Sequence, residues 1–455
     1  MRWWMWLVAG LLLLVCLVIA VRIHGTIAFA ETQAELKRMG FATTMEEFVA
    51  AGPAVDRDRQ ARLRRLMDAG GGWRDDISYA LPFNDLQEQR PTAKDLAKRD
   101  QALRDGGADM AALGAILAEG PVELSVFGWC ERDPARLRTM DLATATSTPL
   151  PNLLAIRAAA NWWSIRACLD PDPEPHLRDL DRLADAMRHP GTLIDAMIGI
   201  ALNAIRDQTH LWLATRGRLA PERLHAWAGE PSRSRPGCAA GYAGERCLFH
   251  EPLSRTRWSY AALSGYSGGF LADAAGFAAI WPTQGHEAAY CSSFLAATEA
   301  ELLDRPRPTL RTMPFGYQGV ISRVVLPNLV ESGITATESA YRHRLVRCAG
   351  LLAEVHRRDG ALPPTLPPEA PAAALDPNQP AVAYERLTSS RFRIGFDPAG
   401  PPPPAIPAGR VTTAIGRPAG TAPASAYGGV RWSLEADFDA ILIPPPDKPA
   451  KAKKP

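Results

Sequence analysis

The residues whose types and spacing could support catalysis lie in a glycine-rich stretch, Gly265-Tyr266-Ser267-Gly268-Gly269. This stretch fits the Gly-x-Ser-x-Gly nucleophile elbow, which sets a serine on a sharp turn from a strand into a helix. Residues 258–263 could form that strand and residues 270–277 that helix. The residues that could complete a Ser…Asp…His order lie downstream: Asp304, Asp359, His343 and His356.

The elements around this stretch do not fit a serine hydrolase. An α/β-hydrolase needs alternating strands and helices, whereas the residues that precede Ser267 are patterned as helices. Glycines at this density also suit a loop or the close packing of helices. A serine hydrolase that uses Ser267, with His343 or His356 as its histidine, is therefore the alternative interpretation. The main interpretation assigns no catalytic residue.

Metal and cofactor motifs are incomplete in the sequence. His286-Glu287 begins like the zinc-binding helix of metalloproteases, but Tyr290 stands where the second histidine is needed. There is no Cys-x-x-Cys pair, no Cys/His quartet, no phosphate-binding glycine loop and no dinucleotide fingerprint. We therefore predict no metal and no cofactor.

Two other groups of side chains allow both a functional and a structural interpretation. Trp162 and Trp163 could form a platform for a sugar, but core packing is the commoner role of tryptophans on a long amphipathic helix. The arginines of residues 59–65 could meet lipid headgroups near a membrane, or form a solvated helix face. The structural interpretation is favoured for both.

The first residues of the chain predict a membrane anchor. Residues 3–21 carry no charge over 19 positions, and as a helix they span close to the roughly 30 Å hydrocarbon core of a bilayer. Tryptophans at one end suit the membrane interface. Ala28-Phe29-Ala30 resembles a signal-peptidase site, but a signal h-region is usually shorter and Arg22 would precede the cut. An uncleaved anchor is favoured over cleavage after Ala30.

The expected orientation of the apolar segment indicates where the chain is located, and the charge balance limits its partners. A short N-terminal tail before a lone apolar segment usually stays in the cytoplasm, which would export residues 25–455 to the periplasm from the bacterial inner membrane. The chain has 51 Lys+Arg against 49 Asp+Glu, a balance that argues against nucleic acid as a partner. The expected partners are the lipid bilayer, through residues 3–21, and other envelope proteins.

Cysteine usage is compatible with export. Cys238 and Cys247 flank a glycine-containing stretch that could form a loop, and a disulfide could close that loop as in a hairpin. The other interpretation is that the cysteines outside the anchor are small buried hydrophobic residues.

Apolar periodicity predicts a mostly helical chain. Overlapping capping boxes at Thr43 and Thr44, and a cap at Thr192, mark helix starts. Further helices are expected near 94–118 with an interruption at Gly106-Gly107, across 149–229, and near 316–359 with a break near Pro327. Half of the 40 prolines lie beyond residue 360, where the pattern changes to strands. The expected strands are 382–387, 391–396, 430–434 and 438–443.

Four stretches carry a resemblance to a group of uncharacterised, membrane-anchored, mostly helical bacterial proteins with a pseudopilin-like C-terminal segment. They are the anchor with residues 44–53, residues 189–201 with 219–224, Gly244-Glu245-Arg246, and residues 357–394 with Asp437. The resemblance implies a helix packed on a small antiparallel sheet at the C-terminus. It implies no filament assembly, because the pilin helix is not adjacent to this segment. The pseudopilin calcium loop is not matched at Asp397-Pro398-Ala399-Gly400, so no calcium is expected.

The sequence therefore predicts a mainly α protein. It would have a transmembrane helix, a helical bundle or irregular helical array, and a small C-terminal α+β pseudopilin-like element. The expected domains are an anchor at 1–24, an exported helical domain at 25–335, a long helix with a small sheet at 336–446, and a disordered tail at 447–455. We expect a single-pass envelope protein with a structural or protein-interaction role and no catalysis.

Overall fold

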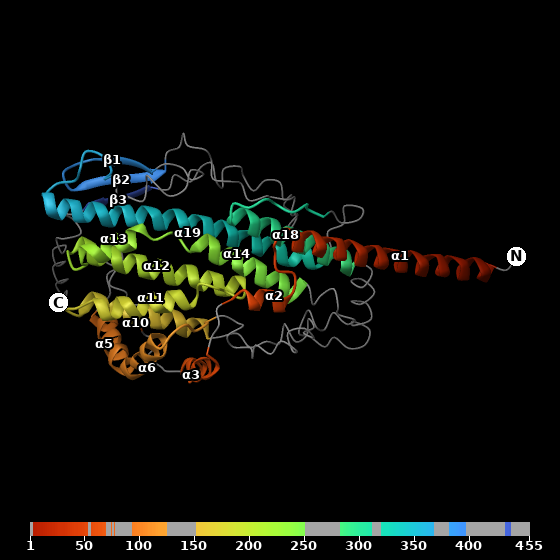
Figure 1. The fold of residues 1–455 in the computed structure, drawn as a ribbon, viewed down its shortest axis with the longest axis horizontal. Helices are drawn as coiled ribbons and strands as arrows, with labels where there is room; N and C mark the ends of the chain where they lie inside the picture. Colours follow the sequence, from red (N-terminus) through yellow and green to blue (C-terminus); the bar gives the residue numbers. More distant parts are fainter. Residues whose placement is uncertain are drawn as a thin grey trace, which may run out of the picture.

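The computed structural model describes residues 3–52, 56–69, 74, 77, 93–124, 152–250, 283–311, 320–367, 382–396 and 433–437. These residues form a mainly helical body with an apolar N-terminal helix and a small antiparallel sheet, as the sequence predicts (Figure 1). The helices are α1 (Trp3–Arg38), α2 (Met45–Ala50), α3 (Arg57–Asp68), α5 (Ala93–Asp105), α6 (Gly107–Ala118), α10 (Leu153–Leu169), α11 (Glu174–Ala186), α12 (Leu193–Thr215), α13 (Pro221–Gly229), α14 (Ser234–Glu245), α18 (Gln284–Leu302) and α19 (Val320–Asp359). A π-helical turn, η2 (Arg246–His250), continues α14. The strands are β1 (Val382–Arg386), β2 (Arg391–Phe396) and β3 (Ser433–Asp437).

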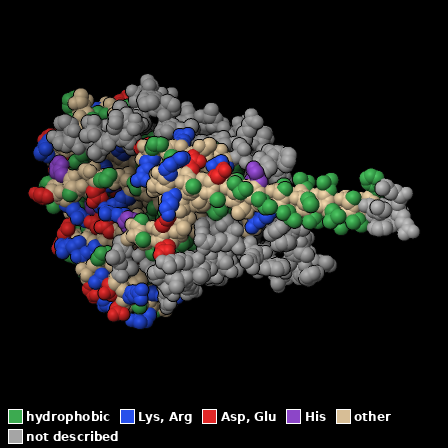
Figure 2. All heavy atoms as spheres, turned by 45° about the vertical axis from the view of Figure 1, so that its right-hand side comes forward, with side chains coloured by type: hydrophobic (Ala, Val, Ile, Leu, Met, Phe, Trp, Pro, Cys, Tyr) green, Lys and Arg blue, Asp and Glu red, His purple; other side chains and the backbone are tan. Residues whose placement is uncertain are grey.

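Helix α1 has two halves with different surroundings. Its first half projects beyond the body, and its apolar side chains are exposed (Figures 1 and 2). Its second half packs on α18. The buried positions Gly25, Thr32 and Leu36 recur at helical spacing and form a single stripe. A Cβ added at Gly285 of α18 would lie 2.6 Å from the carbonyl oxygen of Gly25, so the two helices meet backbone to backbone.

The centre of the body is built from α12, α14, α18 and α19, which pack on one another. Helix α19 is one continuous helix of 40 residues, and at about 1.5 Å per residue it is about 60 Å long. The predicted break near Pro327 is therefore wrong. Proline removes one backbone donor, and here the helical assignment continues through that position to Asp359. The interruption predicted at Gly106-Gly107 is confirmed, because α5 ends at Asp105 and α6 begins at Gly107.

The sheet lies beside the C-terminal end of α19 (Figure 1). Its order is β1-β2-β3 with antiparallel pairing, and Ile394 stands opposite both Tyr384 and Leu434. Phe392 and Ile394 are buried and join one apolar cluster with residues of α12, α13 and α19. The sheet thus shares its core with the bundle. The strands predicted at 382–387 and 391–396 are confirmed. The strand predicted at 430–434 overlaps β3, which continues to Asp437, whereas the strand predicted at 438–443 lies outside the described residues.

Of the two interpretations of Cys238 and Cys247, the structure supports the buried hydrophobic residues and not the disulfide. The residues between the two cysteines are helical, because they lie in α14 and the start of η2. Nine residues of helix separate the thiols by about 13 Å along the axis and turn them to opposite faces. Both thiols are buried and neither forms a disulfide. The Cys238 Sγ lies 3.6 Å from the Ser332 carbonyl oxygen, and the Cys247 Sγ lies 3.6 Å from the Ala42 carbonyl oxygen. Burial raises the pKa of the Cys238 thiol to about 12.

The close approach of α14 to the start of α12 generates a testable prediction. A Cβ added at Gly244 would lie 2.7 Å from the carbonyl carbon of Gly191, which is backbone and cannot move aside. We expect Gly244→Ala to lower the free energy of unfolding by about 1–3 kcal/mol. The measurement is urea unfolding of the full chain in detergent, followed by circular dichroism.

The matched control is Gly237→Ala in the same helix. A Cβ at Gly237 meets nothing within 4 Å, so this change should be neutral or stabilise the protein by about 0.5–1 kcal/mol through helix propensity. Equal stability of the two variants would contradict the close contact at Gly244.

Candidate functional site

Three segments that are distant in the sequence meet at one place in the structure, which we call the α12–α14 junction. It consists of the turn before α12 (residues 189–192), the end of α14 with the start of η2 (residues 244–247), and the segment that leads into α2 (residues 41–48). Gly244 lies against Gly191, and the ring of Phe48 is next to it. The junction also contacts α18, which in turn holds the second half of α1. Segments distant in the sequence are thereby joined to α1.

Arg246 holds the segment before α2 in place. Its side chain is 1% exposed, and its guanidinium donates from Nη2 to the Ala42 carbonyl oxygen at 2.9 Å and from Nη1 to Glu299 Oε2 at 2.6 Å. Its Cζ lies 5.4 Å from the centre of the Phe41 ring. A buried cation that is paired with a carboxylate and a carbonyl is expensive to leave unpartnered. Arg246 therefore joins η2 both to α18 and to the segment between α1 and α2.

Two carboxylates cap the start of α12. Asp195 is fully buried, and its Oδ2 accepts from the backbone nitrogens of Gly191 at 3.1 Å and Thr192 at 3.0 Å. With the Thr192 side chain these bonds complete a capping box, which confirms the predicted helix start. Glu245 Oε1 accepts from the Leu193 nitrogen at 3.0 Å. Burial, and the charge of nearby Asp195, raise the pKa of Glu245 to about 7.

A second polar group lies inside the bundle, around Trp227 of α13. Trp227 Nε1 donates to Asp207 Oδ1 at 2.8 Å, and His343 Nδ1 donates to Asp207 Oδ2. Because a carboxylate can only accept, the proton of the neutral His343 ring must be on Nδ1. The His343 Nε2 has no hydrogen-bond partner among the described residues. Burial and the charges of Arg347 and Arg206 lower the pKa of His343 well below its usual value.

Charged side chains surround this group. Arg206 is 2% exposed and pairs with Asp181 and, at 2.7 Å, with Glu230. Arg347 lies 3.7 Å from Glu230, and burial lowers its pKa to about 9 against the opposing attraction of that carboxylate. His210 stacks on Trp227 with a centroid distance of 5.2 Å. The network joins α11, α12, α13 and α19, so it fixes their relative positions.

The catalytic candidates that the sequence suggests lie in separate parts of the structure or outside the described residues. Ser267 and its glycine-rich stretch lie outside the described residues. His343 and His356 lie on the same helix, and their separation of 13 residues is about 20 Å. Asp304 has a positive φ of 53° just after α18 and pairs with Arg235 at 3.0 Å, while Asp359 pairs with Arg358. Among the candidates that the structure describes, Asp304, His343, His356 and Asp359, none are brought together, and His343 is instead paired with Asp207.

The tryptophan pair is part of the core. Trp163 is 1% exposed, and Trp162 is 8% exposed with its Nε1 donating to the Leu103 carbonyl oxygen at 3.2 Å. A sugar platform requires both rings to be open to solvent, so that interpretation is wrong. The Arg-rich run of α3 is a polar helix face, in which Arg62 and Arg59 pair with Glu119, the residue that follows α6.

Sequence reasoning missed both the Trp227 group and the carboxylates of the junction. One signal was present: Asn203, Arg206, Asp207 and His210 recur at three- and four-residue steps along α12. Such spacing places polar side chains on one helix face, and here that face is buried. Within the described residues, no group of three His, Cys, Asp or Glu side chains is arranged to hold a metal ion.

Comparison with known proteins gives no family model, no curated protein and no solved structure that matches this chain.

The raised pKa of Glu245 generates a prediction about stability and pH. The folded state holds the Glu245 proton up to a pH of about 7, whereas the unfolded chain releases it near 4.5. The folded state therefore binds more protons between these values, and this group makes stability fall as the pH rises through that window. We expect Glu245→Gln, which keeps an acceptor for Leu193, to become more stable relative to the natural chain by about 1–3 kcal/mol between pH 5 and pH 7.5.

The measurement is urea unfolding of both proteins at the two pH values. Glu222→Gln removes an equal charge from an exposed position of α13 and serves as the control. The same pH-dependent difference in the control, or none in Glu245→Gln, would contradict the assignment.

Proposed function

We propose that this chain is a single-pass envelope protein with a structural or protein-interaction role and no catalysis. The observation that carries the proposal is the division of α1. One continuous helix supplies an exposed apolar segment, which by length and composition could cross a membrane, and a second segment that is docked on the core. A rigid link of this kind suits a protein that holds a folded body at a membrane.

Several features support the structural role. The charged groups that a catalytic site would require face one another inside the bundle: Arg246 with Glu299, and Arg206 with Asp181 and Glu230. Pairing of this kind fixes helices in position. Arg206, Arg246 and Glu299 are buried, while Asp181 and Glu230 are partly exposed. The long helix α19 leads from the bundle to the sheet, the arrangement implied by the pseudopilin-like resemblance (Figure 1). We propose other envelope proteins as its partners.

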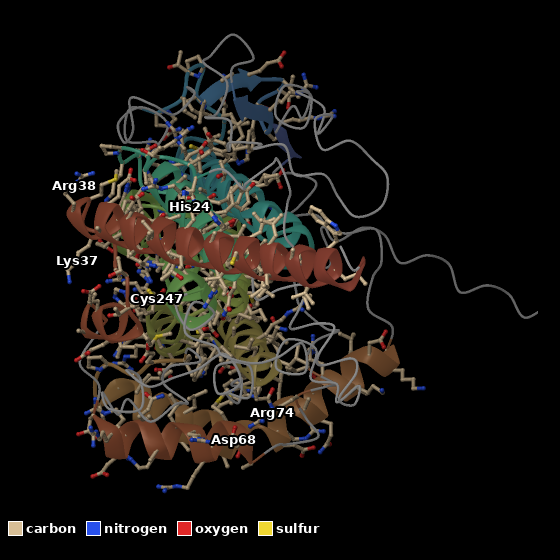
Figure 3. The ribbon with its side chains drawn as sticks, turned by 90° about the vertical axis from the view of Figure 1, so that its right-hand side faces the viewer. His24, Lys37, Arg38, Asp68, Arg74 and Cys247 are labelled. Atoms are coloured by element: carbon tan, nitrogen blue, oxygen red, sulfur yellow. The ribbon has the colours of Figure 1, made fainter. Side chains whose placement is uncertain are left out.

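We propose that the anchor is retained and that residues 25–455 face the periplasm. Cleavage after Ala30 would remove Gly25 from its contact with Gly285, and His24 from its contact with His286 at 3.3 Å. Figure 3 shows His24 partway along α1 and Lys37 and Arg38 near its C-terminal end. The docked half of α1 would be cut in its middle, which favours the uncleaved helix.

One observation favours the alternative, a serine hydrolase. The pair of Asp207 and His343 has the arrangement of the acid and the histidine in a catalytic triad, with the far ring nitrogen available to accept a proton. The mainly helical fold and the burial of His343, at 7% exposed, argue against it.

The anchoring proposal predicts the effect of charge in the exposed half of α1. Leu13→Asp with Leu14→Asp places two carboxylates near the centre of the apolar segment, where each costs about 2.5–3.5 kcal/mol for insertion. We expect this variant to leave the membrane fraction at alkaline pH, while the natural chain remains in it. The control is Arg38→Asp, which changes the charge by the same amount at the other end of α1 and should remain in the membrane.

Orientation is tested by adding protease to spheroplasts. Digestion of the body would support export, and its protection would overturn it. A mature chain that begins at Glu31 would overturn the uncleaved anchor.

The two candidate functions are separated by a fluorophosphonate probe, which labels activated serines. The structural role predicts no labelling of the full chain in membranes. Labelling that is lost in both Ser267→Ala and His343→Gln, but kept in His356→Gln, would establish the hydrolase and overturn the non-catalytic proposal.

A further inference from the structure

The face of α1 that points away from α18 carries a regular apolar seam. Its positions alternate steps of four and three residues from the membrane segment into the docked half: Ala9, Leu13, Cys16, Ala20, Ile23, Ile27, Ala30 and Ala34. This is the a/d repeat of a coiled coil, in which two helices meet along a seam with a period of 3.5 residues. Lys37 occupies the next position and ends the seam.

All eight positions of the seam are exposed in the single chain. Ile23 is 55% exposed and Ile27 is 51% exposed, although both lie beyond Arg22, at the end of the charge-free segment. The buried stripe of Gly25, Thr32 and Leu36 lies on the opposite face, so docking on α18 leaves the seam open. The charge-free segment ends at Val21, and α1 rises about another 20 Å from there to Ala34. The second half of the seam therefore lies beyond the hydrocarbon that the charge-free segment would span.

We propose that a second copy of this chain covers the seam, so that the protein forms a parallel dimer through α1. This inference rests on the proposed insertion of α1 in a membrane. Two copies inserted in one bilayer with the same orientation hold the same residues at the same height, which brings each seam position opposite its equivalent. The small residues Ala9, Cys16 and Ala20 let helices approach closely inside the membrane, where packing rather than the hydrophobic effect drives association.

The residues beside the seam allow a parallel pair. In a parallel coiled coil, the residue just before an a position of one helix faces the residue just after the next d position of the partner helix. Here Thr26 would face Glu31 of the second copy, and Gln33 would face Arg38 of the second copy. Neither pairing brings like charges together. None of the eight seam positions is occupied by Asp, Glu, Lys or Arg.

Cys16 provides the test, because it is exposed and lies on the seam, whereas the other described cysteines are buried. The full chain in native membranes is oxidised with copper phenanthroline, which couples two thiols to a disulfide and takes up the two electrons. We expect a product of twice the chain mass that disappears in Cys16→Ala. In the Cys16→Ala background, Ile23→Cys and Ile27→Cys should restore it several-fold above Leu14→Cys, which lies on the other side of the helix.

Each outcome decides the proposal. Equal cross-linking from Leu14→Cys and the seam positions, or none from the seam, would overturn the dimer and leave lipid as the cover of α1. A product joined to a chain of different mass would overturn it in favour of another protein. Alkaline extraction of the same membranes shows whether each variant is inserted, so a failure of anchoring is distinguished from a failure of self-association.

Discussion

The rest of the fold depends on the backbone contact between Gly244 of α14 and Gly191 before α12. A side chain at Gly244 would overlap the backbone of that turn, so the two helices can meet at this angle only without one. Their closeness sets Glu245 on the first amide of α12 and directs Arg246 to the Ala42 carbonyl and Glu299. Helix α18 in turn packs on the second half of α1, where Gly25 and Gly285 form a second backbone contact of the same kind.

The buried charges favour one arrangement of the helices over others, and they contribute little to the net free energy of folding. Taking the arginines Arg206 and Arg347 out of water costs several kcal/mol per ion, and their attraction to the partly exposed Glu230 offsets part of this cost. The apolar clusters supply the favourable free energy, and the ionic network selects among the ways in which apolar helices could pack.

Local signals in the sequence predict the helices and strands, but they do not predict which of these elements pack together. The cap at Thr192, the break between α5 and α6, and the first two strands are specified by a few neighbouring residues, and each was predicted correctly. The site could not be predicted in this way, because Asp207, Trp227 and His343 come from three helices and meet only through packing. The Cys238–Cys247 loop was wrong because Gly241 and Gly244 read locally as turn residues, whereas their role is to admit the backbone of another segment.

The sequence by itself determined the apolar N-terminal helix, the helical character of the body and the change to strands after residue 360. These properties follow from apolar periodicity, capping and proline, which act over a few residues. Only the tertiary structure decided that α19 continues through Pro327, that Trp162 and Trp163 are core residues, and that one face of α1 is docked while the other is open. The docking of α1 and the pairing inside the bundle depend on which helix faces which, and that is set by contacts between residues more than 100 positions apart, such as Gly25 with Gly285 and Asp207 with His343.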